Sequence, residues 1–115
     1  MAFNDAALNV AGDAMAATYP WIAIHTAGTV DDSTNESSAG RVAAGWSTAT
    51  NGGDIVSGPL SFTGGESEGP AVRVGYWSAE TGGDYGGGSL LDGDSAFNAA
   101  GEYTVNEITE DGSAS

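Results

Sequence analysis

The spacing of apolar residues changes at Pro20, and this change separates a helical start from a longer β region. Residues 4–18 (NDAALNVAGDAMAAT) repeat small apolar side chains near the helical period, and Asn4 or Asp5 can cap the first turn. The stripe consists of Ala7, Leu8, Ala11, Ala14 and Met15. Gly12 weakens the helix pattern, and Pro20 ends it, so we expect one helix over residues 4–18.

Beyond the helix, short apolar runs alternate with clusters of Gly, Ser, Asp and Asn, a pattern typical of about six short strands. The expected strands cover residues 21–27, 41–50, 54–63, 72–79, 84–91 and 102–109. In the second of them Val42, Ala44 and Trp46 share one face. Gly58-Pro59 interrupts the third, which indicates a bulge, a corner or an edge.

This series of strands predicts the fold class and the domain organisation. We expect an all-β chain, folded as a small β-sandwich or barrel with a short N-terminal helix. Residues 1–115 form a single domain, since no repeat or linker divides them, and the tail at 110–115 is expected to fray.

The glycine-rich stretch at residues 72–91 (VRVGYWSAETGGDYGGGSLL) can be read as a phosphate-binding loop or as a β-hairpin. A phosphate-binding loop needs a helix directly after its glycines, and the segment after Gly88 is too short and too glycine-rich for that helix. The chain also contains no lysine for a Walker motif. We therefore expect a hairpin, with one strand through Ser78, a turn at Glu80–Gly83 and a return strand from Tyr85.

The chain is strongly acidic, with a net charge of −14 from sixteen Asp and Glu residues and two arginines, Arg41 and Arg73. Many carboxylates without lysine are typical of a saline cytoplasm or brine, where salt screens the repulsion between them. An acidic protein of an ordinary high-GC organism is the alternative. Two arginines cannot neutralise a row of phosphates, so we expect no direct binding to nucleic acid or to an acidic membrane.

The lack of cysteine excludes disulfides, thiolate metal sites and cysteine nucleophiles. The N-terminal residues include Asp5 and Asp13 and no basic segment, which argues against a secretory signal. No apolar run reaches the length of a membrane span. We expect a soluble protein that is made in the cytoplasm and can leave the cell inside or on a particle.

The residues able to carry chemistry are few, and each has a simpler structural interpretation. His25 is the only histidine, and its strand pattern predicts a packed side chain rather than a catalytic base. Two acidic loops could hold Ca²⁺ or Mg²⁺, but neither has the spacing of a calcium-binding loop, and solvated carboxylates are the preferred interpretation. The weak metal candidates are Asp31, Asp32, Asp92 and Asp94. The Asn35-Glu36-Ser37 triplet fits a glycosylation acceptor. We expect no enzyme activity and no cofactor.

Aromatic residues favour a core and a contact surface over a sugar-binding face. If Val72, Val74 and Tyr76 fill the core, the alternation of a strand leaves Arg73 and Trp77 on the outer face. An outward tryptophan beside an arginine is a good interface anchor. We therefore expect Arg73 and Trp77 to contact another chain, and Trp77→Ala to release the subunit without unfolding it.

These segments, in this order, carry a resemblance. A helix near NDAALNVAGDAMAAT is followed by a strand like WIAIHTA and by a polar loop that leads to Arg41 and Trp46. The hairpin VGYWSAETGGDYGGGSL and a closing segment like AAGEYTV complete the series. Over residues 3–109 the chain resembles a family of small virion structural proteins of tailed viruses, called minor capsid, decoration or tail-fibre-like proteins.

The resemblance implies a compact β-sandwich that serves as a building block and has no known chemistry. With the acidity, it implies a capsid decoration or turret (minor capsid) subunit of a tailed virus of a halophilic archaeon. Such a subunit would be located in the virion as a homo-oligomer, in contact with its own copies and the major capsid protein. A tail-fibre or baseplate domain that touches the host surface and its glycans is the first alternative. A free carbohydrate-binding module that uses Trp46 or Trp77 is the second.

The acidity generates a prediction about salt. The melting temperature is expected to rise between low and molar potassium chloride, because salt screens the repulsion among the carboxylates. Thermal unfolding followed by circular dichroism over this range measures the effect. An unchanged or falling melting temperature would remove the halophilic interpretation.

Overall fold

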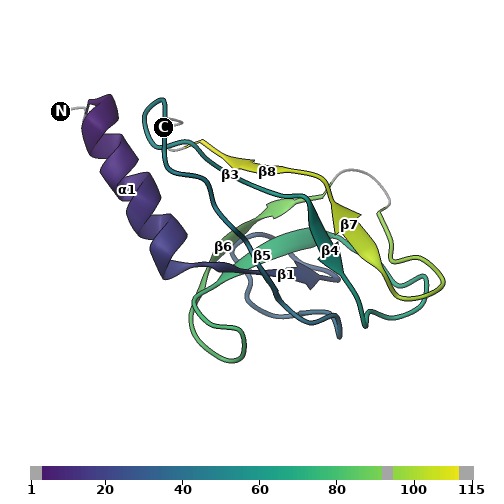
Figure 1. Cartoon of the computed structure of the whole chain (residues 1–115). Coiled ribbons are helices and arrows are strands. Elements are labelled where there is room, and N and C mark those ends of the chain that lie inside the picture. Colours follow the sequence, from purple (N-terminus) through teal and green to yellow (C-terminus); the bar gives the residue numbers. More distant parts are fainter. Residues whose placement is uncertain (1–3, 92–94, 112–115) are drawn as a thin grey trace.

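The computed structural model describes residues 4–91 and 95–111 and shows a mostly β chain with one N-terminal helix, as the sequence predicts (Figure 1). The elements are α1 (Asp5–Thr18), β1 (Trp21–His25), β2 (Val42–Ala43), β3 (Ile55–Ser57), β4 (Leu60–Phe62), β5 (Arg73–Trp77), β6 (Tyr85–Leu90), β7 (Tyr103–Val105) and β8 (Ile108–Glu110). The metal candidates Asp92 and Asp94 lie outside the described residues.

Four strands form an antiparallel sheet in the order β2-β1-β5-β6. Its centre is the pair β1 and β5, which runs from Trp21 opposite Trp77 to His25 opposite Arg73. β5 and β6 form the hairpin expected from the glycine-rich stretch, with an irregularity in register between Tyr76 and Trp77. β6 is thus an edge strand of this sheet.

The remaining strands form two short antiparallel pairs, β3 with β8 and β4 with β7. The strands expected at 54–63 and 102–109 are therefore each split in the middle. At the first split Gly58 has a φ of 115° and Pro59 lacks an N–H for the ladder, so the interruption is a corner, one of the three forms that the sequence left open. A Cβ on Gly58 would lie 2.6 Å from the carbonyl oxygen of Asn106, at the second split. The two segments bend together because glycine permits this close approach.

The core lies between the four-stranded sheet and the two strand pairs. In Figure 1, β3 and β8 run above the sheet, and β4 and β7 lie at its right-hand side. Both sides contribute large side chains, and the most buried of these are Ile22, Ile24, Leu60, Phe62, Val74, Val105 and Ile108. The prediction that Val72, Val74 and Tyr76 face the core is confirmed for Val74 and Tyr76, whereas Val72 is half-buried and is not part of this core cluster. The expected strand at 41–50 shortens to β2, although Val42, Ala44 and Trp46 still share the core side.

The helix forms where the sequence predicts it, but the side of the helix that packs on the body differs from the predicted apolar stripe. The side chain of Asn4 caps it by accepting a hydrogen bond from the Ala7 amide at 2.9 Å, and it ends two residues before Pro20. Among its residues Gly12 is buried, whereas Val10 and Met15 are 69% and 47% exposed. The apolar stripe that includes Met15 is therefore not the side that packs on the body.

Polar contacts to a distant turn hold α1 in place. The Asn9 side-chain oxygen accepts hydrogen bonds from the Gly52 and Gly53 amides, and an Asp13 carboxylate oxygen accepts one from the Ala49 amide at 2.8 Å. Between these contacts, a Cβ on Gly12 would lie 2.6 Å from the Gly53 carbonyl oxygen. Glycine in mid-helix thus allows the turn to approach the helix axis closely enough for both side chains to reach it.

Gly12→Ala tests this docking. Alanine favours an isolated helix by about 1 kcal/mol over glycine. Here the added methyl group would collide with Gly53, so we expect the free energy of unfolding to fall by about 1–3 kcal/mol in chemical denaturation. Gly40→Ala is the matched control, since a Cβ at Gly40 meets nothing within 4 Å, and should be neutral or slightly stabilising. Stabilisation by Gly12→Ala would show that α1 does not dock at this point.

Candidate functional site

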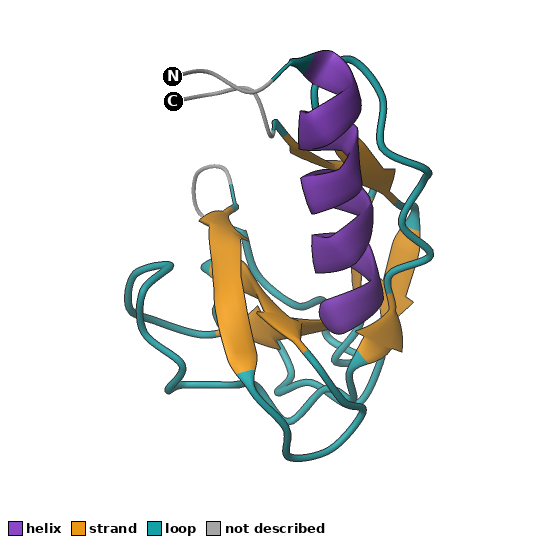
Figure 2. Cartoon of the chain, turned by 90° about the vertical axis from the view of Figure 1, so that its left-hand side faces the viewer, coloured by secondary structure: helices purple, strands orange, loops and turns teal. Residues whose placement is uncertain are grey.

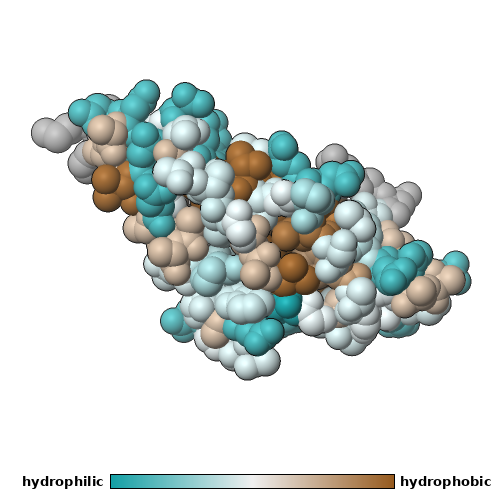
Figure 3. Space-filling model, viewed as in Figure 1, coloured by the Kyte–Doolittle hydropathy of each residue, from teal (hydrophilic) through white to brown (hydrophobic). Residues whose placement is uncertain are grey.

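A groove of about 440 Å³ opens between α1 and the hairpin strand β6. Figure 2 looks onto the side where these two elements run next to each other. The residues that line the groove are Met15, Tyr19, Val30, Asp31, Trp46, Gly53, Ile55, Tyr76, Gly86, Gly87, Gly88, Glu110 and Asp111. Hydrophobic surface also lies on the outer side of α1 (Figure 3).

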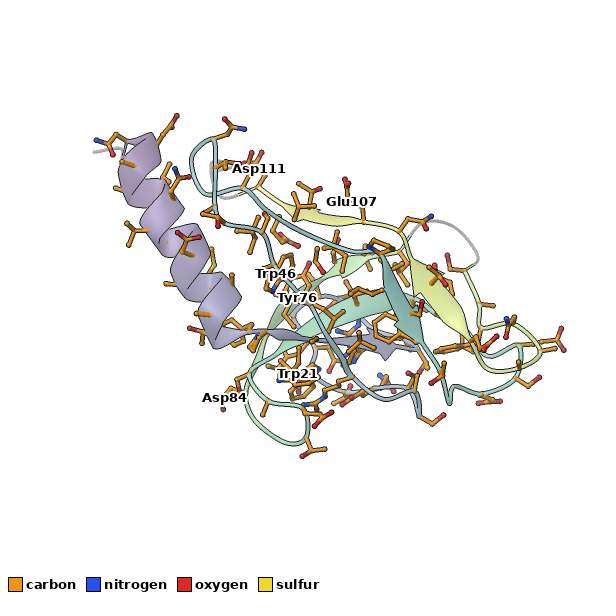
Figure 4. The ribbon with its side chains drawn as sticks, viewed as in Figure 1. Trp21, Trp46, Tyr76, Asp84, Glu107 and Asp111 are labelled. Atoms are coloured by element: carbon orange, nitrogen blue, oxygen red, sulfur yellow. The ribbon has the colours of Figure 1, made fainter. Side chains whose placement is uncertain are left out.

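Aromatic residues build the floor of the groove. The Trp46 indole nitrogen donates a hydrogen bond to the Tyr19 carbonyl oxygen at 3.0 Å. The Trp46 and Tyr76 rings meet edge to face, with centroids 5.5 Å apart, and lie next to each other in Figure 4. The Tyr19 ring lies on the backbone of Gly86, where a Cβ would come within 2.5 Å of a ring carbon. The floor is thus fixed by packed rings, and β6 offers bare backbone to the groove at Gly87, where a Cβ would meet nothing within 4 Å.

A carboxylate closes one end of the groove. The hydroxyl of Tyr76 donates a short hydrogen bond to a carboxylate oxygen of Glu110 on β8. Burial of Tyr76 and its bond to Glu110 raise the pKa of the Tyr76 hydroxyl well above its ordinary value. The hydroxyl therefore remains a donor at physiological pH and holds the Glu110 side chain beside the aromatic floor.

The opposite face of the sheet carries a buried polar cluster instead. Arg73 is fully buried, and its guanidinium donates to the carbonyl oxygens of Ala27 and Thr34 and to the Tyr85 hydroxyl, at 3.0, 2.9 and 2.8 Å. The Tyr85 hydroxyl in turn donates to the Val30 carbonyl oxygen at 2.6 Å. The expectation that Arg73 contacts another chain is wrong, because the loop after β1 covers this face and the guanidinium binds that loop.

Trp77 lies on this face as well, as the alternation of the strand predicts, and it is partly exposed. The Arg41 guanidinium stacks on its ring at 3.8 Å from the centroid. Arg41 also forms a 2.8 Å ion pair with Glu36 and donates to the carbonyl oxygens of Ala79 and Gly82. The contact of Trp77 with another chain remains a prediction, but truncating Trp77 would also remove contacts within its own chain.

His25 packs inside this cluster, which confirms the expectation of a buried histidine. Its Nδ1 lies 2.8 Å from the Thr34 carbonyl oxygen, and its Nε2 lies 3.3 Å from the Trp77 indole nitrogen. The indole can only donate, so Nε2 accepts and the proton of the neutral ring is on Nδ1. Burial lowers the pKa of His25 below its ordinary value.

The acidic loop that was a weak metal candidate has a local structural role. An Asp32 carboxylate oxygen accepts hydrogen bonds from the amide and hydroxyl of Thr34 at 2.8 and 2.6 Å, and these bonds lower the Asp32 pKa. Asp31 is exposed and lines the groove. Within residues 4–91 and 95–111, no group of three or more His, Asp or Glu side chains could hold a metal ion. Asn35 is exposed, as a glycosylation acceptor requires.

The buried histidine generates a prediction about pH. The His25 imidazole should titrate below 6.5 in an NMR titration. The unfolded chain then binds a proton near pH 6.5 that the folded chain binds only at lower pH, so His25 lowers the free energy of unfolding as the pH falls from 6.5 to the folded pKa. His25→Gln should lose this component of the pH dependence in molar salt. A titration midpoint above 6.5 would contradict the neutral His25 ring with its proton on Nδ1.

Comparisons with known proteins do not assign a function to this chain. None of the described helices is long and apolar enough to cross a membrane. No protein family, no curated protein and no solved structure matches this chain.

Proposed function

We propose that this chain is a non-enzymatic structural subunit of a virus particle. The position we propose is that of a capsid decoration or turret subunit of a tailed virus of a halophilic archaeon. The resemblance over residues 3–109 supports this position, as does the acidic, lysine-free composition. We also propose that the sheet and the two strand pairs facing it form a small β-sandwich, the building block that the resemblance implies.

The observation that carries the proposal is the exposed apolar surface of α1, which lies on two sides of the helix. Met15 is exposed where it lines the groove, and Val10 is exposed on another side of the same helix, which is attached to the rest of the chain around Gly12. A helix of this length is marginal alone in water, and exposed apolar surface of this kind commonly marks a contact with another molecule. Adhesion through the exposed apolar residues of α1 and the groove would both stabilise the helix and attach the subunit.

A carbohydrate-binding module is the second candidate, and one observation favours it. Trp46 and Tyr76 form an aromatic floor in an open groove, which is a common element of sugar-binding sites. Trp77 supports this candidate less, since Arg41 covers one face of its ring. A tail-fibre or baseplate domain would use the same surfaces at another position in the particle.

The proposal predicts that the chain is part of purified particles and attaches through α1. In particles released by the strain that encodes it, the chain should sediment with the major capsid protein at a fixed ratio in molar salt. Val10→Glu combined with Met15→Glu should lower incorporation at least about 10-fold, because both side chains are exposed and carboxylates would disrupt an apolar contact. Val56→Glu, at a residue 36% exposed on β3 and outside the groove, is the control and should leave incorporation unchanged.

Two results would contradict the proposal. One is recovery of the chain only from the soluble fraction of producing cells, with no copy in gradient-purified particles. The other is specific binding of the isolated chain to a glycan array, with loss of that binding in Trp46→Ala, which would favour the carbohydrate-binding module.

A further inference from the structure

The positive side chains of this protein are all used inside the fold. Arg73 is fully buried beneath the loop after β1, and the Arg41 side chain is 7% exposed and paired with Glu36. His25 is buried and neutral. The chain has no other Lys, Arg or His. The outer surface therefore presents carboxylates without a positive side chain to balance them.

The groove combines this negative surface with an apolar floor. Glu110 lies at one end, where the Tyr76 hydroxyl holds it, and the exposed Asp31 lies on the rim. Trp46 and Tyr76 provide aromatic surface beside the Glu110 carboxylate. A carboxylate next to aromatic rings is the environment that an alkylammonium or guanidinium group binds, by ion pairing and by cation–π contact.

We infer that the groove binds a segment of a different protein that carries a lysine or arginine between apolar side chains. This inference rests on the proposed function, because it names the chemistry of the partner to which the subunit attaches. The cation would lie at Glu110, and the apolar side chains would lie on Trp46 and against Met15. A groove of about 440 Å³ holds a few side chains of such a segment, but not a folded domain.

The backbone of β6 suits an extended segment. Gly87 leaves the backbone of β6 open, since a Cβ there would meet nothing within 4 Å, whereas the Tyr19 ring covers the neighbouring Gly86. β6 is the last strand of its sheet, and edge strands are the usual place where an extended peptide adds to a folded domain. The apolar floor and the open strand thus favour the same extended occupant.

Charge complementarity argues against a second copy of this chain as the occupant. Each copy carries a net charge of −14, and its arginines and histidine are committed within its own fold. Two copies brought together at the groove would add carboxylates to carboxylates, with no side-chain cation between them. A basic segment of a heterologous protein provides what the copy lacks.

The test uses the isolated, ¹⁵N-labelled chain and two synthetic peptides of opposite charge. The probes are the acetylated, amidated peptides Leu-Lys-Leu-Lys-Leu and Leu-Glu-Leu-Glu-Leu, titrated in moderate potassium chloride and followed by NMR. We expect the lysine peptide to shift the Trp46 indole signal and the amides of Gly86–Gly88. The glutamate peptide should bind at least about 10-fold more weakly, and molar salt should weaken binding of the lysine peptide.

A matched pair of variants locates the charge. Glu110→Gln keeps an oxygen that can accept the Tyr76 hydrogen bond and removes the negative charge, so affinity for the lysine peptide should fall about 10-fold. Glu107→Gln makes the same change on an exposed side chain outside the groove and should change affinity less than about 2-fold. If Glu110→Gln does not keep a folded spectrum, Asp31→Asn on the exposed rim provides the same measurement.

Several results would overturn the inference. Equal affinity for the two peptides, or equal effects of Glu110→Gln and Glu107→Gln, would remove the role of charge. Shifts of the same groove signals with protein concentration alone, with a dimer in sedimentation, would assign the groove to a second copy. These results are independent of the particle experiment: peptide binding without incorporation rejects the virion role alone, and incorporation without charge-dependent binding rejects this inference alone.

Discussion

The guanidinium of Arg73 is buried against the outer face of β5, and the arrangement of that whole face depends on it. Removing a charged group from water is costly unless its donors are satisfied, and here two backbone carbonyls and the Tyr85 hydroxyl satisfy them. The carbonyls belong to Ala27 and Thr34, so the arginine fixes the loop that follows β1. His25 binds the same Thr34 carbonyl, which joins both side chains to one loop.

Glycine allows large rings and backbone to pack closely on both faces of the sheet. A Cβ on Gly75 would lie 2.3 Å from the His25 ring, and one on Gly86 would collide with the Tyr19 ring. Gly12 allows the same closeness between α1 and its turn. The nineteen glycines of the chain thus do more than form turns, because several provide space for aromatic side chains in a body with few large aliphatic residues.

The internal use of both arginines also shapes the surface. Arg73 and Arg41 hold loops in place on the outer face. The sixteen acidic residues far outnumber these two arginines, and the net charge is −14. A surface of one sign repels its own copies and attracts basic partners, more strongly at low salt than at high salt. The proposed basic partner follows from this separation of charge, and the exposed apolar residues of α1 and the aromatic groove would provide the contact area.

The sequence alone determined the features that depend on neighbouring residues: the helix capped by Asn4, the hairpin of β5 and β6, and the core side of Val74 and Tyr76. Periodicity and turn chemistry act over a few residues, so they can be seen in the sequence. The sequence did not predict the docking side of α1, the burial of Arg73 or the groove. Only the tertiary structure decided these, because they depend on backbone groups far away in the chain: the turn near Gly53 for α1, and the Thr34 carbonyl for Arg73.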